Sequence, residues 1–168
     1  MSCRAVAFVH LPSRFFAALS LGMVLCLGLL PAGAQALPYI KGATYDPSIP
    51  NIQQVLGHAS GEKITTPADL IRYLRALEGA SRRIKVESIG KSWEGRELVF
   101  AYIGSEANIA RLAEIRAGMQ RLGDPRKTNE AEAKALIADL PAILCLAYSV
   151  HGNEISPSDA AIAMAYHM

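Results

Sequence analysis

The chain has 168 residues, with 17 lysines and arginines against 15 aspartates and glutamates, and it contains three cysteines. A formal charge of +2 provides no strongly basic surface, which argues against nucleic acid as a partner. Two of the three cysteines fall near the N-terminus, so the rest of the chain cannot hold a disulfide framework.

The first 36 residues have the composition of a secretory signal peptide. Two arginines precede an uncharged apolar run, residues 15–30, which is followed by Pro31 and by small residues up to Ala36. A basic flank, an apolar core and an A-x-A site predict cleavage after Ala36 and a secreted or periplasmic protein with no stable membrane anchor. A transmembrane anchor is the alternative, because residues 15–36 are nearly long enough to span a bilayer.

Removal of residues 1–36 leaves 132 residues, with 15 basic and 15 acidic side chains and a net charge near zero. Cys145 is the only cysteine of this part, and the apolar run around it predicts a buried, unreactive thiol. Residues 37–63 are rich in proline, glycine and polar turn residues. We therefore expect an extended lead-in there, which packs on the domain without a regular element of its own.

Helix and strand patterns begin at residue 64. The stretch "TTPADLIRYLRALEGAS" predicts a helix with Thr66 as its N-cap, Pro67 in its first turn and Gly79 at its end. The apolar residues of this helix recur at helical spacing and form its expected buried stripe: Leu70, Ile71, Leu74 and Leu77.

Two short strands and two helices follow. "RIKVESIG" and "ELVFAYIG" predict strands joined by a hairpin loop that contains Gly95. Apolar residues of the first strand alternate with polar ones and are expected on its buried face: Ile84, Val86 and Ile89. Helices are predicted from about residue 108 to 122 and from about residue 130 to 140.

The run "AILCLAYS", residues 142–149, contains almost no polar side chain. Such a run is typical of a strand covered on both faces, as in a largely parallel sheet. Ser156, Pro157 and Asp159 then predict the capped start of another helix. The expected fold class is therefore α/β, with an incomplete mixed, largely parallel sheet flanked by helices.

His151 and Glu154 directly follow the predicted strand, at the sheet edge where α/β proteins form ligand crevices. A histidine and a carboxylate three residues apart on a tight turn can aim at one point, and zinc accepts both kinds of ligand. Gly152 is expected to permit the sharp turn and Asn153 to fix it by bonding to local backbone. By itself the H-x-x-E spacing is a weak signal, and a solvated loop is the simple alternative.

Together with a second motif, the "HGNE" stretch resembles the zinc carboxypeptidases of the carboxypeptidase A type. The second motif is G-x-S-x-E-G-R-x-L, which this chain carries as "GKSWEGREL", residues 90–98. The resemblance covers about Ile64 to His167 and implies the first part of a three-layer catalytic domain. It also implies one zinc ion per complete site, His151 and Glu154 as two of the zinc ligands, and hydrolysis of C-terminal amino acids from peptides or proteins.

The resemblance also implies residues that this sequence does not contain. The second zinc histidine, the general-base glutamate and the carboxylate-binding arginine of the family lie beyond the last residue given. We therefore expect no catalytic residue within this chain, which would be an N-terminal portion that is inactive alone and poorly soluble. His58 is expected to be a surface loop residue and His167 a helix-end residue. Neither is therefore expected to replace the missing zinc ligand. Trp93 and Arg96 are expected to brace the sheet.

Two alternative functions remain open. The aspartoacylase and succinylglutamate desuccinylase group, which are zinc-dependent deacylases of N-acyl amino acids, also take metal ligands from an H-G-N-E stretch. They are mostly intracellular and lack the G-x-S-x-E-G-R hairpin, so the predicted signal peptide argues against them. The third possibility is a non-catalytic remnant module, because a catalytic zinc normally has three protein ligands and the motif supplies two.

Overall fold

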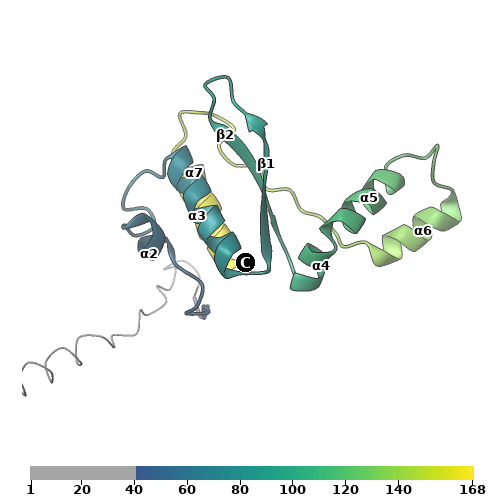
Figure 1. The fold of residues 1–168 in the computed structure, drawn as a ribbon, viewed down its shortest axis with the longest axis horizontal. Helices are drawn as coiled ribbons and strands as arrows, with labels where there is room; N and C mark the ends of the chain where they lie inside the picture. Colours follow the sequence, from purple (N-terminus) through teal and green to yellow (C-terminus); the bar gives the residue numbers. More distant parts are fainter. Residues whose placement is uncertain (1–40) are drawn as a thin grey trace, which may run out of the picture. The chain divides into compact units, whose positions relative to one another are not determined.

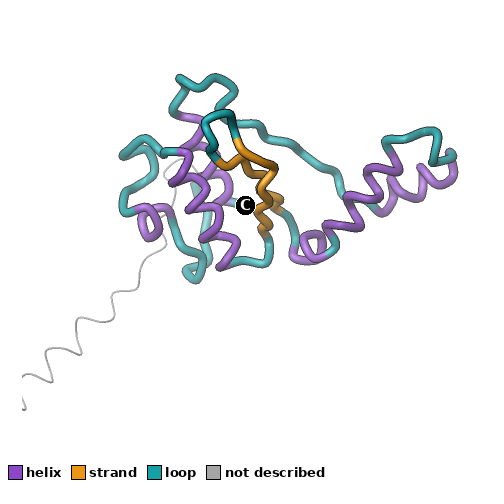
Figure 2. Tube along the Cα trace, turned by 45° about the horizontal axis from the view of Figure 1, so that its top comes forward, coloured by secondary structure: helices purple, strands orange, loops and turns teal. Residues whose placement is uncertain are grey.

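The computed structural model describes residues 41–168, so the predicted signal peptide lies outside the described residues. The described part is mixed α/β, with a two-stranded antiparallel sheet and six helices (Figures 1 and 2). In chain order the elements are α2 (Ile52–Leu56), α3 (Pro67–Ala80), β1 (Ile84–Lys91), β2 (Glu97–Ile103), α4 (Glu106–Ala110), α5 (Leu112–Leu122), α6 (Glu130–Asp139) and α7 (Ser156–His167). None of these helices has the length and apolarity that crossing a membrane requires.

The core lies between α3, α7 and the inner face of the hairpin. Helices α3 and α7 run side by side (Figure 1), and the central residues Tyr73 of α3 and Ile162 of α7 have no exposed surface. The short helix α2 adds Ile52 to the same cluster. The buried members of this cluster are Ile52, Tyr73, Leu74, Leu77, Ile84, Val86, Ile162, Ala163 and Tyr166.

The predicted hairpin is confirmed. Strands β1 and β2 pair antiparallel, and Gly95 in the connecting loop has φ +77°, a left-handed conformation that glycine adopts without steric cost. Ile89 differs from the prediction, because it is 54% exposed. The pairing register skips between Ser88 and Gly90, so a bulge at Ile89 interrupts the alternation of inward and outward side chains.

Helix α3 begins as the sequence predicts. The side chain of Thr66 accepts a hydrogen bond from the backbone N–H of Asp69, and Pro67 occupies the first turn. Gly79 does not end the helix, which continues to Ala80 and closes when the N–H of Ser81 donates to the carbonyl of Leu77.

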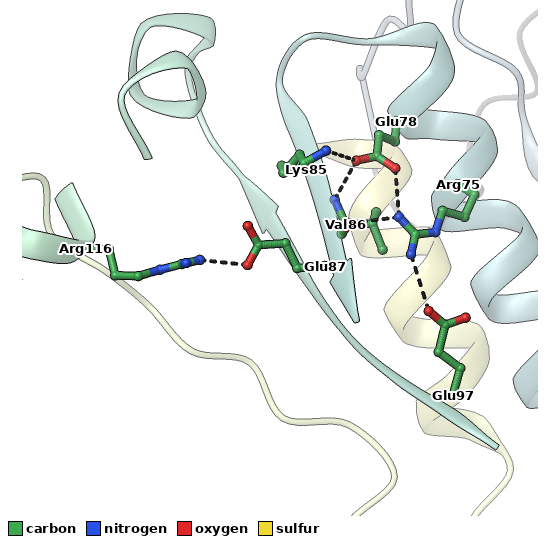
Figure 3. Close-up of polar contacts among 7 residues, drawn as sticks. All are labelled: Arg75, Glu78, Lys85, Val86, Glu87, Glu97 and Arg116. Atoms are coloured by element: carbon green, nitrogen blue, oxygen red, sulfur yellow. Dashed lines mark hydrogen bonds and ion pairs between the residues drawn. The ribbon is translucent and has the colours of Figure 1, made fainter. Parts of the chain in front are cut away.

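Side chains of α3 also close the outer edge of β1 (Figure 3). The N–H of Val86 donates to Glu78 Oε1 at 3.0 Å, and Arg75 Nη1 donates to the carbonyl of Val86 at 2.7 Å. Lys85 and Glu97 extend this group with ion pairs of 3.1 and 3.4 Å to Glu78 and Arg75. Because Val86 has both backbone polar groups occupied, no further strand can pair with β1 at this point.

Two segments, the lead-in and the helix predicted over residues 108–122, differ from their predictions. The lead-in was expected to lack regular structure, but it contains α2, which Asn51 and Gln54 close with a capping box. Five residues are too few for helical periodicity to be visible in the sequence. The helix predicted over residues 108–122 is divided at Arg111 into α4 and α5, and Arg111 pairs with Asp139 of α6 at 3.1 Å.

Residues 142–149 do not form the predicted strand. They run between α6 and α7 as an irregular stretch without helix or strand, called the extended segment below, and Leu144 is 81% exposed (Figure 1). The thiol of Cys145 is also exposed, where a buried one was expected. A strand requires a neighbour to bond its N–H and C=O groups, and within residues 41–168 the sheet consists of β1 and β2 alone. The α/β class is confirmed, whereas the parallel part of the predicted sheet is not found in the described residues.

The contacts of Arg75 and Glu78 with the backbone of Val86, called the Val86 bracket below, predict a pH-dependent loss of stability. Partial burial acts to raise the pKa of Glu78, but hydrogen bonds from Val86, Lys85 and Arg75 together outweigh it and hold this pKa below its ordinary value. We expect Glu78→Gln to lower the free energy of unfolding by about 1 kcal/mol or less at neutral pH, because glutamine still accepts from Val86 and loses only the charge. The difference from wild type should vanish as the pH falls through the lowered pKa, because the wild-type carboxylate is then protonated.

Urea denaturation between pH 3 and pH 7 measures this difference. Glu114→Gln on α5, an exposed position outside the bracket, is the matched control. Equal effects of the two substitutions at every pH would contradict the role given to Glu78.

Residues 142–149 are apolar and exposed, so we expect the chain to be poorly soluble and a charged substitution in this segment to raise its solubility. We expect Leu144→Lys to raise the solubility of the chain while changing the free energy of unfolding by less than about 0.5 kcal/mol, because Leu144 is 81% exposed. Ala135→Lys places the same charge on an exposed position of α6 and is the control for net charge. An equal gain in solubility from both substitutions would show that the segment is not the cause.

Candidate metal site at the HGNE turn

The HGNE turn, residues 151–154, lies between the extended segment and α7. The N–H of Glu154 donates to the carbonyl of His151 at 3.1 Å, which closes the turn. The side chains of the same two residues also meet, with His151 Nδ1 and Glu154 Oε1 3.0 Å apart. The structure thus brings together the two residues that the sequence predicts as metal ligands.

The separation of these two atoms is compatible with a shared zinc ion. Two ligands of a tetrahedral zinc, each at ~2.1 Å from the metal, lie about 3.4 Å apart. The observed 3.0 Å is a hydrogen-bond distance and is shorter by a few tenths of an ångström, so the two atoms would give up this hydrogen bond and separate slightly to bind one ion. The side chains of His151 and Glu154 are 70% and 50% exposed, so an ion can approach them from solvent.

An open hollow of about 390 Å³ lies beside the turn, and Glu154 forms part of its wall. The end of the extended segment and the first turn of α7 supply the rest of the lining, which includes Tyr148, Val150, Pro157 and Ala160. The lining also includes Ser149 and Ser156, so Glu154 borders a mainly apolar hollow that a small molecule could enter.

The backbone strain of this region falls on Ser149 rather than on Gly152. Ser149 has φ +56° and is the only non-glycine residue with a positive φ in the described chain. Gly152 does not have a positive φ, and a Cβ atom added to it would meet no atom within 4 Å. The expectation that glycine permits the turn is therefore wrong. Asn153 was expected to bond to local backbone, but within residues 41–168 its side chain has no hydrogen bond.

The other two histidines of residues 41–168 contact different partners. His58 is buried, contrary to the expected surface position, and its Nδ1 lies 3.0 Å from the carbonyl oxygen of Ala59. His167 ends α7 as predicted, with its Nδ1 3.2 Å from the hydroxyl of Tyr45. Among the residues described, no group of three or more histidine, cysteine, aspartate and glutamate side chains could hold a metal.

The G-x-S-x-E-G-R-x-L motif shapes the hairpin loop through Ser92. Its N–H donates to the carbonyl of Arg96 at 2.7 Å, and its hydroxyl accepts from the N–H of Arg96 at 3.1 Å. Trp93 is fully exposed and Arg96 pairs with Glu94 at 2.7 Å, so neither side chain braces the sheet as expected. The long side chains of the motif point to solvent, and the small ones determine the loop.

A contact between Thr65 and Asp159 was not predicted. The sequence pattern indicated Ser156 as N-cap and Asp159 as its capping partner, but Ile155 takes the N-cap position and makes no side-chain cap. The carboxylate of Asp159 instead accepts a hydrogen bond from the hydroxyl of Thr65, 94 residues earlier in the chain. Capping patterns identify partners within one turn, so this distant partner gives no signal in the sequence.

Comparisons with protein-family models, with curated proteins and with solved structures found no match for the chain. A function therefore rests on the geometry of the HGNE turn and on the two sequence motifs.

The geometry at Gly152 predicts that alanine is tolerated there. Because a Cβ would meet no atom and φ is not positive, we expect Gly152→Ala to change the free energy of unfolding by less than about 0.5 kcal/mol. Gly95→Ala is the matched comparison, since its φ of +77° should make alanine cost about 1–2 kcal/mol. Thermal denaturation compares the two, and equal losses would contradict the difference in backbone conformation.

Proposed function

We propose that His151 and Glu154 are two ligands of a zinc site in a metallocarboxypeptidase, an enzyme that removes C-terminal amino acids from peptides. The observation that carries the proposal is the 3.0 Å approach of His151 Nδ1 to Glu154 Oε1 on an exposed turn. The hairpin motif supports the same family, because the deacylase group that shares the H-G-N-E stretch lacks it.

Zinc in such a site would polarise the scissile carbonyl and lower the pKa of a bound water. His151 would contribute a neutral imidazole nitrogen, and Glu154 an ionised carboxylate that offsets one positive charge of the ion. A catalytic zinc site uses three protein ligands, so a third ligand and the proton acceptor would be supplied from outside residues 41–168. We expect the described residues alone to bind zinc weakly and to release no amino acid from peptides.

The proposal includes a fold and a location. Residues 64–168 would be the first part of a three-layer α/β domain, in which residues 142–149 become an inner strand of a largely parallel sheet. Their extended, apolar and exposed character supports this, since an inner strand buries both faces. Residues 1–36 would export the protein to the periplasm or the exterior.

Removal of the imidazole tests the ligand pair. We expect His151→Ala to weaken Zn²⁺ binding at least about tenfold, because one of two protein ligands is lost. His167→Ala, at the end of α7, is the matched control and should leave the affinity unchanged. Competition with a chromophoric zinc chelator measures both dissociation constants. Equal weakening in the two variants, or no zinc binding by the wild-type chain, would contradict the proposed site.

A further inference from the structure

The first turn of α7 lacks the anchors that usually hold the start of a helix. Its N-cap residue, Ile155, has φ −89° and ψ −33° and forms no side-chain cap. The buried residues of α7 begin only at Ile162, in the second half of the helix. Apolar packing therefore fixes the body of α7 and leaves its first turn dependent on polar contacts.

One polar contact joins this first turn to the core. Thr65, a residue only 3% exposed, donates its hydroxyl proton to Oδ1 of Asp159. Hydrogen bonds to an ionised carboxylate are stronger than those between neutral groups. Thr65 directly precedes Thr66, the N-cap of α3, so the contact ties the start of α7 to the start of α3.

Both ends of the HGNE turn are attached to the same first turn of α7. On the C-terminal side Glu154 is separated from Ser156 by a single residue. On the N-terminal side the hydroxyl oxygen of Ser149 lies 3.4 Å from that of Ser158, the neighbour of Asp159. Ser149 itself has φ +56°, a backbone conformation that is unfavourable for a residue with a side chain. A shift of the first turn would therefore move both ends of the HGNE turn.

We infer that Asp159 is a positioning residue for the metal site. Its bond to Thr65 fixes the first turn of α7, and through that turn it sets the separation and direction of His151 and Glu154. The inference rests on the proposed function in one respect, since the pair is taken to bind zinc. Asp159 is not one of the two proposed ligands, and its carboxylate accepts the Thr65 hydroxyl.

The test compares four variants of the full chain with Zn²⁺ alone as the probe. Thr65→Val removes the hydrogen bond, and Asp159→Asn replaces its charged acceptor with a neutral amide oxygen. We expect each to raise the zinc dissociation constant about tenfold, the size of effect typical when support for metal ligands is lost. Thr65→Ser keeps the hydroxyl and should restore an affinity close to wild type. Asp69→Asn changes the corresponding first-turn aspartate of α3 and should leave the affinity unchanged.

A second measurement needs no metal. Amide hydrogen exchange at Glu154, whose N–H is bonded within the turn, should become several-fold faster in Asp159→Asn and Thr65→Val. Exchange at Ile162 in the core should remain slow, which shows that the variants are folded.

Two outcomes would overturn the inference, and they are separable from failure of the proposed function. If Asp159→Asn lowers stability while zinc affinity and Glu154 exchange stay at wild-type values, Asp159 is a structural residue only. If serine at position 65 fails to restore what valine removes, the hydroxyl is not the group that positions the turn. Absence of zinc binding by the wild-type chain would end the proposed function, and the exchange rate of Glu154 would still decide whether Asp159 orders the turn.

Discussion

Helix α7 is held against α3 by the burial of Ile162, Ala163 and Tyr166, and the position of the HGNE turn depends on that packing. The two helices are joined at their starts by Thr65 and Asp159. Near the end of α7 the ring of Tyr166 stacks on Tyr45, with ring centroids 4.8 Å apart. The turn directly precedes α7 in the chain, so the first turn of this helix sets the position of the C-terminal end of the HGNE turn.

The need to pair backbone polar groups explains the contrast between the two extended parts of the molecule. At Val86 the outer edge of β1 is closed by Arg75 and Glu78, which is one way in which proteins protect the edge of a sheet. Residues 142–149 have no such partner in the described chain and remain exposed. The outer edge of β1 is therefore closed at Val86, whereas the backbone polar groups of residues 142–149 have no strand partner in the described chain.

Sequence patterns predicted those features that depend on neighbouring residues. Thr66 as a cap, Gly95 in the hairpin loop and the approach of His151 to Glu154 all involve partners within a few positions. Where a feature depends on distant partners, the sequence-based prediction was either absent or wrong. The strand at residues 142–149 requires neighbours that its own sequence does not specify, and the partner of Asp159 lies 94 residues away. Apolar composition thus predicted a need for burial, and the described fold does not satisfy that need.

The most direct measurement of the central claim is nuclear magnetic resonance of the histidine side chains during addition of Zn²⁺ to the ¹⁵N-labelled chain. If His151 and Glu154 form a ligand pair, the ring nitrogens of His151 should shift first, and those of buried His58 and of His167 should stay in place. An equal response of His151 and His167, both exposed, would show non-specific binding and would contradict a metal site at the HGNE turn.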